Sequence, residues 1–143
     1  MNFYYKENNA ADLAVGTFSL FQKTVCASDV MIFCGETGDL SPLYQNEYYG
    51  KASDLEASVV PPMLVASMLG GSVYRLLSPN AFPIKRSFDT IKPLVVGDTV
   101  TTRAEIAKLD IEKNQVVLTL EAYNSKEELV MTGTSIEQLV GRK

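Results

Sequence analysis

The stretch from Met63 to Leu77 constrains the fold more than any other part of the sequence. Pro61 and Pro62 come directly before it, and proline is tolerated in the first turn of a helix. Apolar residues then fall on nearly every side of the predicted helix, namely Met63, Leu64, Ala66, Met68, Leu69, Val73, Leu76 and Leu77. A helix that is apolar all round belongs inside other structure. The rest of the chain must therefore supply a surface that covers it.

Strand-like runs after this helix can form that surface. The run at 98–109 alternates between apolar and polar residues, the period of a strand with one buried face. Three further runs are predicted, separated by turn residues, at 82–91, 116–123 and 129–140. The sequence predicts that these four strands form an antiparallel meander.

The chain before the long helix predicts shorter elements. Thr17–Cys26 reads as a strand with a possible β-bulge, because Phe21 is out of phase with Phe18 and Leu20. A short helix over 29–37 follows, capped by Ser28 or Asp29, then a loop over 38–42 and a helical turn over 46–51. This order predicts one α+β domain over residues 1–143, with an antiparallel sheet wrapped around a long central helix.

The absence of histidine decides which chemistries are open to the chain. It excludes a Ser–His–Asp or Cys–His triad and a zinc site with the usual histidine ligands. Cys26 and Cys34 cannot form a four-thiolate site alone, and we expect them to be free thiols. Neither phosphate-binding glycine motif is present. We therefore expect no metal and no cofactor.

Charge and hydropathy limit the classes of binding partner that we expect for the chain. The chain has 17 acidic and 13 basic residues, a formal charge of −4, which disfavours binding to nucleic acid. No apolar run approaches the ~18 residues that span a membrane, and the first residues lack a signal-peptide pattern. We expect a cytoplasmic protein that binds neither nucleic acid nor membrane.

Three separated motifs carry a resemblance to a known family. The segment Phe33–Tyr44 contains TGDLSPLY and resembles the hydratase motif F-x-x-x-[ST]-G-D-x-N-P-x-H of MaoC-like dehydratases and (R)-specific enoyl-CoA hydratases. Met63–Ser67 resembles the start of the central helix of that family, and Pro93–Val100 resembles its P-V-x-x-G-D-x-[IVL] segment. The similarity extends from about Thr17 to Val140. It implies the hot-dog fold.

The resemblance also implies a hydro-lyase site. In the family, the motif Asp and His face an acyl thioester on coenzyme A or an acyl-carrier protein, and they move water across carbons 2 and 3. The Asp falls on Asp39, the motif Asn on Ser41 and the His on Tyr44. Tyr44 departs from the pattern, because a phenol with a reference pKa near ~10 is a poor base at neutral pH. Tyr44 is therefore expected to position substrate or to fill the volume of the His.

The oxyanion donor also departs from the family pattern. The family's H-G-M falls on Pro61-Pro62-Met63, so the residue whose amide would hold the thioester oxygen becomes Pro62. Proline has no N–H to donate. If the alignment shifts by one residue, Met63 becomes the donor. Substrate binding is therefore assigned to Ser41, Pro62 and Met63.

Several alternatives stay open at the level of sequence. Asp39 could simply close an Asx turn. A lone carboxylate could move one proton between carbons 2 and 4, which is a double-bond isomerisation. The chain could also be a degenerate subunit that binds an acyl thioester or pairs with an active hydratase subunit, and a hot-dog thioesterase is a third choice. The substrate would belong to fatty acid or polyketide metabolism. The phosphates of coenzyme A or of a carrier protein's phosphopantetheine could bind to four basic residues, Lys85, Arg86, Lys92 and Arg103. Ordinary solvent-exposed strand faces explain these basic residues equally well. The resemblance implies a homodimer or a pair with a related subunit.

Overall fold

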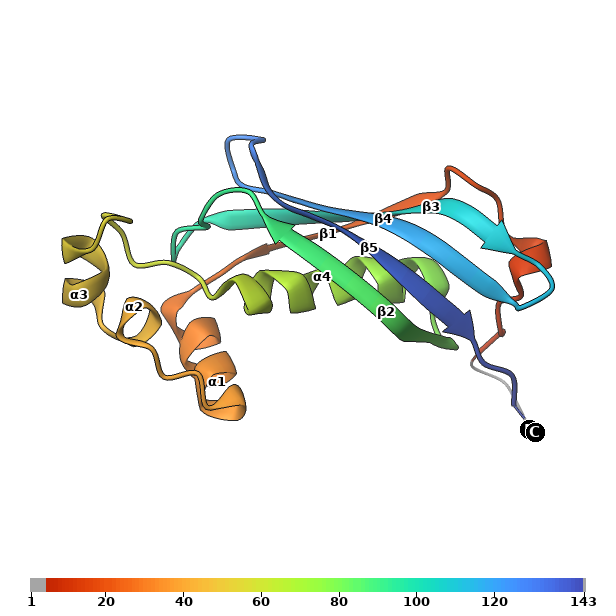
Figure 1. Ribbon diagram of the computed structural model, residues 1–143, viewed down its shortest axis with the longest axis horizontal. Helices are drawn as coiled ribbons and strands as arrows, with labels where there is room; N and C mark the ends of the chain where they lie inside the picture. The colour runs from red at the N-terminus through yellow and green to blue at the C-terminus, as the bar shows by residue number, and fades with distance from the viewer. Residues whose placement is uncertain (1–4, 143) are drawn as a thin grey trace.

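The computed structural model describes residues 5–142. A five-stranded antiparallel sheet curves over one long helix, and three short helices stand beyond one end of the sheet (Figure 1). The elements in chain order are a 3₁₀ turn (Ala10–Asp12), β1 (Phe18–Thr24), α1 (Ala27–Thr37), α2 (Pro42–Gln45), α3 (Glu47–Ala52), α4 (Pro62–Leu77), β2 (Ala81–Thr90), β3 (Thr99–Asp110), β4 (Gln115–Tyr123) and β5 (Leu129–Leu139). The predicted fold class, an α+β sheet wrapped around a central helix, is confirmed.

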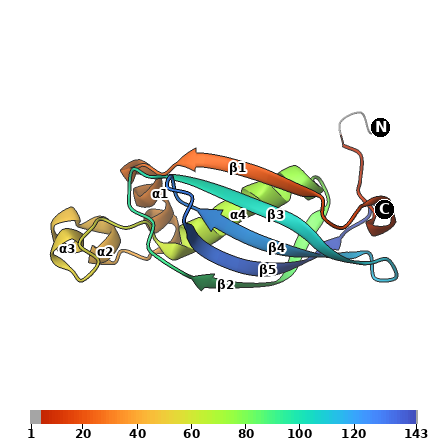
Figure 2. The same cartoon turned by 90° about the horizontal axis from the view of Figure 1, so that it is seen from above.

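The strand order is β1-β3-β4-β5-β2 (Figure 2). The strands β3, β4 and β5 form the predicted meander. The strand β2 does not join β3, its neighbour in sequence, but pairs with β5 at the far edge. The expectation of a four-strand meander is therefore wrong for β2, because the long connection from β2 to β3 lets the chain cross the sheet.

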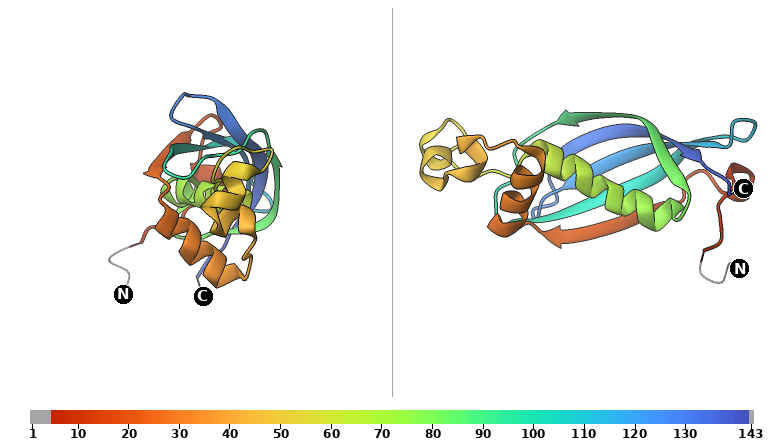
Figure 3. Two further views of the ribbon diagram at one scale, coloured as in Figure 1. Left: turned by 90° about the vertical axis from the view of Figure 1, so that its left-hand side faces the viewer. Right: turned by 90° about the horizontal axis from the view of Figure 1, so that it is seen from below.

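The helix α4 lies against the concave face of the sheet (Figure 3). Its buried residues are Val65, Ala66, Leu69, Ser72, Val73 and Leu77, and they meet the inward side chains of β3 and β4. Ser72 is polar yet fully buried, and its hydroxyl donates to the Thr102 carbonyl oxygen at 2.9 Å. The bond satisfies a group that would otherwise be costly to bury.

The predicted bulge in β1 is wrong. The strand pairs with β3 without a register shift, from Phe18 opposite Glu105 to Thr24 opposite Thr99. Phe21 faces α4, where its ring packs against Gly71, and Phe18 is exposed on the other face of the sheet. The Arg103 guanidinium lies 4.6 Å from the centre of the Phe18 ring. An exposed aromatic ring thus finds a partner outside the core, which the apolar pattern alone cannot indicate.

The helix α1 begins two residues before the predicted start, with Cys26 rather than Ser28 or Asp29 at the N-cap. Asp29 is the third helical residue, and its carboxylate accepts from the Cys26 backbone N–H at 2.8 Å. Lys23 contacts the same carboxylate at 2.8 Å. The Lys23 hydrogen bond, followed by the Cys26 one, lowers the pKa of Asp29. Asp29 thus fixes the start of α1, as acidic residues in a first turn do.

The chain from residue 38 to 61 extends beyond the sheet and connects α1 to α4 (Figure 2). The helix α2 begins inside the stretch predicted as loop, and α3 occupies the predicted helical turn. Cys26 is exposed and Cys34 is buried, and both are free. Within residues 5–142, no helix is long and apolar enough to cross a membrane.

Candidate functional site

The turn between α1 and α2 presents Asp39 to solvent. Gly38 ends α1 with φ at 76°, a left-handed conformation that glycine adopts without strain. The Asp39 backbone N–H donates to the Thr37 hydroxyl at 3.3 Å, whereas the Asp39 carboxylate has no hydrogen-bond partner among the described residues. The structure therefore gives no support to an Asx turn closed by Asp39.

Ser41 is the N-cap of α2, and its hydroxyl accepts from the Leu43 backbone N–H at 3.3 Å. This contact explains locally why a small polar residue stands at this position. A hydroxyl has a second lone pair and a proton to offer, so the predicted contact between Ser41 and a substrate stays a prediction.

The Tyr44 side chain is half-buried, and the charge of Asp39 acts on it. Burial raises the pKa of Tyr44, and the charges of Asp39 and then Cys34 raise it further. The phenol is therefore neutral across the physiological range. Its hydroxyl makes no hydrogen bond to any residue in the described part of the chain. A neutral hydroxyl and a carboxylate, neither of them hydrogen-bonded within the described part of the chain, are thus both available to a ligand.

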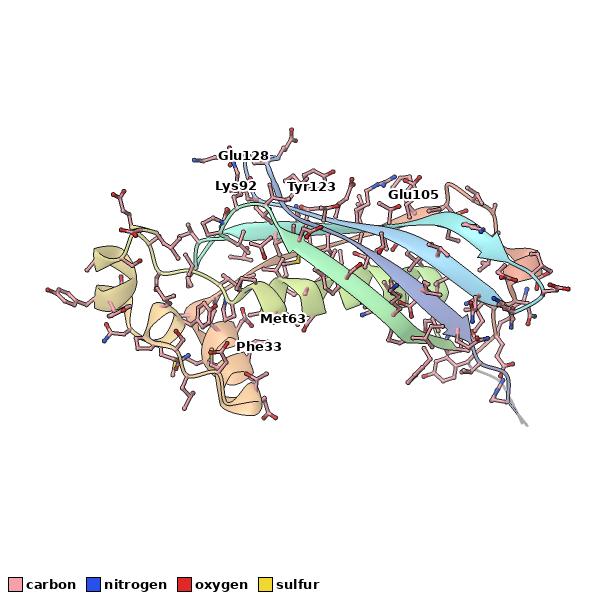
Figure 4. The ribbon with its side chains drawn as sticks, viewed as in Figure 1. Phe33, Met63, Lys92, Glu105, Tyr123 and Glu128 are labelled. Carbon is pink, nitrogen blue, oxygen red and sulfur yellow. The ribbon has the colours of Figure 1, made fainter. Side chains whose placement is uncertain are left out.

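The N-terminus of α4 supplies a free backbone donor. Pro61 is the N-cap, and its carbonyl oxygen accepts from the N–H groups of Leu64 at 2.9 Å and Val65 at 3.4 Å. Pro62, the first helical residue, has no N–H. The Met63 N–H is therefore the first donor of the helix, and within residues 5–142 it has no acceptor. Figure 4 shows Met63 at this end of α4.

An apolar pocket of about 190 Å³ opens beside these groups. Tyr44 and Pro62 both line it, together with Val65 of the central helix. Asp39, Ser41 and Met63 are not part of its wall. Of the five predicted site residues, the structure thus brings Tyr44 and Pro62 to one pocket, and the charge of Asp39 acts on Tyr44 and raises its pKa.

The opposite wall of the pocket comes from residues that the sequence did not indicate. Leu94 follows β2, and Val130 and Met131 belong to β5. No local signal could mark them, because only the β2–β5 pairing brings these segments to α4. Lys92 also lines the pocket, and its ammonium lies 3.0 Å from Glu128 (Figure 4). Lys92 is therefore already paired, although the pair is partly exposed and weak.

Tyr44 also borders a second, more polar cavity of about 260 Å³. Gln45, Glu47 and Ser58 line this cavity with part of α1. The Tyr44 ring therefore lies between the apolar pocket and an open polar recess. No group of acidic, cysteine or histidine side chains in the described part of the chain could hold a metal ion.

No family model matches the chain. It is 26% identical to an (R)-specific enoyl-CoA hydratase of Aeromonas caviae over 132 residues, which is 92% of this chain and 98% of that protein. A solved (R)-hydratase structure from A. caviae superposes with a TM-score of 0.86 at 26% identity, covering 90% of this chain and 98% of that one. The chain has the hot-dog fold and is similar in sequence to an (R)-specific enoyl-CoA hydratase.

Two further matches agree with this relationship. A 3-hydroxybutyryl-CoA dehydratase of Methylorubrum extorquens is 25% identical over 126 residues, which is 87% of this chain and 80% of that protein. A MaoC-like dehydratase of Rhodospirillum rubrum has the same fold, with a TM-score of 0.77 at 15% identity over 95% of this chain and 99% of that one. The resemblance stated from the three sequence motifs is confirmed.

Proposed function

We propose that this hot-dog protein acts on an acyl thioester, as an (R)-3-hydroxyacyl dehydratase or, in reverse, an enoyl hydratase. The relationship to enzymes of these names supports the reaction class. The observation that carries the assignment to this site is the apolar pocket between Tyr44 and the start of α4, together with the effect of the Asp39 charge on Tyr44.

The available groups suffice for a dehydration. Asp39 removes the proton from carbon 2, and the resulting enolate charge collects on the thioester oxygen. The Met63 N–H, at the positive end of α4, stabilises that charge. The carbon–oxygen bond at carbon 3 then breaks, and the proton held by Asp39 leaves with the hydroxyl as water. Tyr44 donates a hydrogen bond to the oxygen at carbon 3 and takes no proton, which is consistent with its raised pKa.

The size of the pocket predicts a short acyl chain. An apolar cavity of about 150 Å³ holds benzene, a six-carbon ring, and this pocket has about 190 Å³. We therefore expect four- to six-carbon chains to be preferred. Coenzyme A and an acyl-carrier protein both present the same thioester, and the assay below compares them.

Pairing with a second hot-dog subunit is part of the proposal. The edge strand β2 exposes Phe82 and Ile84, with 61% and 52% of their surface accessible, and unpaired strand edges tend to find partners. We expect a homodimer or a pair with a related subunit. Sedimentation at micromolar concentration should therefore show twice the 15.7 kDa of one chain, or the mass of the mixed pair.

A second candidate function rests on the missing imidazole. Without it, a lone Asp39 suits a shift of the double bond between carbons 2 and 4, which needs one mobile proton. The other possibility is a subunit that binds the thioester without turnover.

One assay separates these functions. The purified protein is incubated with crotonyl and hexenoyl thioesters of coenzyme A and of a carrier protein, and the conjugated absorbance and the products are followed. Loss of conjugation with a 3-hydroxyacyl product supports hydration, and a moved double bond supports isomerisation. Saturable binding with no product leaves the non-catalytic subunit. Asp54→Asn, at an exposed acid that does not itself line the pocket, is the matched control for Asp39→Asn.

A further inference from the structure

A buried ion pair lies between β2 and β5, away from Asp39 and Tyr44. Glu137 is fully buried on the inward face of β5. Its Oε1 accepts from Arg86 Nη2 at 2.7 Å, Arg86 Nε at 3.2 Å and the Ser135 hydroxyl at 2.5 Å. Three donors thus converge on one carboxylate oxygen, and the charge of Arg86 balances that of Glu137.

The other carboxylate oxygen, Glu137 Oε2, is buried without a hydrogen-bond partner among the described residues. Leaving a buried charged acceptor unsatisfied is costly, so such groups call for an explanation. Arg86 likewise uses Nε and Nη2 for Glu137 and Ser135, whereas no hydrogen bond from its Nη1 to the described part of the chain is found.

Both free atoms belong to side chains that line one small cavity. The cavity has about 140 Å³ and lies between the second half of α4 and β2, with Gly70, Val73 and Tyr74 on the helix side. A Cβ built on Gly70 would meet nothing within 4 Å except Arg86 Nη1, at 3.8 Å. Gly70 therefore opens the cavity toward the guanidinium.

No packing contact explains why residue 70 is a glycine. A glycine inside a helix costs about 1 kcal/mol relative to alanine. For the neighbouring Gly71 the Phe21 ring explains that cost, since a Cβ there would lie 3.1 Å from the ring. Gly70 has no such neighbour, and what its missing side chain leaves behind is space beside the Arg86 guanidinium, in a cavity that Glu137 also lines.

We propose that this cavity binds the hydroxyl group of a neutral ligand, which donates to Glu137 Oε2 and accepts from Arg86 Nη1. A hydroxyl offers one donor and an acceptor on the same atom, which matches the two free atoms. A charged group fits less well, because the ion pair is already balanced. The hydroxyl comes either from a small free alcohol or from the far end of an acyl chain.

The test uses the full chain and a matched pair of probes. Propan-2-ol and acetone have nearly the same shape, but only the alcohol can donate a hydrogen bond. We expect propan-2-ol to shift the backbone amide NMR signals of Gly70, Ser135 and Glu137 saturably, and acetone to bind about tenfold more weakly or not at all. Shifts that grow linearly with both probes would mean that neither probe binds specifically in the cavity, and would overturn the proposal.

Two alanine variants make the result specific to the cavity. Gly70→Ala should abolish the saturable shifts while the protein stays folded, because its Cβ meets only ordinary contacts. Gly35→Ala, at an exposed glycine of α1 with nothing within 4 Å, should leave them unchanged. Unaltered propan-2-ol binding by Gly70→Ala would contradict the proposal. A change in the sedimentation mass of that variant would also contradict it, because the cavity would then be part of a subunit interface.

A second arm identifies the source of the hydroxyl. Hexanoyl and 6-hydroxyhexanoyl thioesters of pantetheine are compared in the same NMR titration. If only the hydroxylated chain shifts the Glu137 signal, the ligand is the end of an acyl chain; if neither does while propan-2-ol binds, it is a separate alcohol. Because these experiments measure binding, their outcome does not depend on whether Asp39 catalyses turnover.

Discussion

Gly70 and Gly71 are adjacent in α4, yet the structure predicts opposite effects when each is replaced by alanine. Either substitution removes a helix glycine and so gains up to about 1 kcal/mol of helix propensity. At Gly70 the new methyl group meets only Arg86 Nη1 at 3.8 Å, an ordinary contact. We therefore expect Gly70→Ala to raise the free energy of unfolding by about 0.5–1 kcal/mol.

At Gly71 the same methyl group would lie 3.1 Å from Cδ1 and 3.2 Å from Cγ of the Phe21 ring. The ring or the β1 backbone must move, and forcing extra volume into a packed contact costs about 1–3 kcal/mol. After the propensity gain, Gly71→Ala should lower the free energy of unfolding by up to about 2 kcal/mol. The two variants should therefore differ by about 1–3 kcal/mol.

Urea unfolding of both variants at equal protein concentration measures this difference. The double variant Phe21→Leu with Gly71→Ala should recover part of the loss, because the smaller side chain leaves room for the methyl group. Equal stabilities of Gly70→Ala and Gly71→Ala would refute the reasoning, as would a double variant no more stable than the sum of its single changes predicts.

Three other substitutions probe the fold and the site. Gly133→Ala should prevent pairing of β2 with β5 and leave little folded protein in circular dichroism, since its Cβ would lie 2.4 Å from the Ser87 carbonyl oxygen; a folded, stable variant would contradict this. Asp29→Ala should lower the free energy of unfolding in urea by about 0.5–2 kcal/mol. Because the pKa of Asp29 is lowered in the folded state, this difference in stability from wild type should be full above pH ~4 and should disappear as the pH falls further. A stability difference that persists at pH 2 would argue against the Lys23 contact. Tyr44→Phe should reduce turnover of an enoyl thioester by about fivefold, the value of one hydrogen bond, and a loss of a hundredfold would make Tyr44 a proton-transfer group.

The buried helix and the strands could be predicted because their signals are local. Apolar residues on all sides of Met63–Leu77 required a covering sheet, and the alternation at 98–109 showed which face of β3 is buried. The position of β2 could not be predicted, because its pairing with β5 depends on contacts about fifty residues apart. The bulge was wrongly predicted at Phe21 for a related reason. The Phe21 ring faces α4 and packs against Gly71, a contact between distant residues that the local apolar pattern does not show.

The candidate site was predictable only in part. The motif placed Asp39 and Tyr44 near each other, and the charge of Asp39 does raise the pKa of Tyr44. That the Met63 N–H is left without an acceptor could not be predicted, because the helix boundary decides which backbone groups at the start of α4 are unpaired. The far wall of the pocket, from Leu94 to Met131, needed the complete sheet.

The role of Asp39 as the base is the central claim, and the most direct test compares wild type with Asp39→Asn. The measurement is the hydration rate of crotonyl-CoA, followed by its conjugated absorbance, with Asp54→Asn as the control. The account predicts that Asp39→Asn loses at least about a hundredfold in turnover, the usual scale of general acid–base catalysis, with unchanged substrate binding, and that Asp54→Asn keeps the wild-type rate. Equal turnover by Asp39→Asn and wild type, whether both active or both inactive, would contradict it.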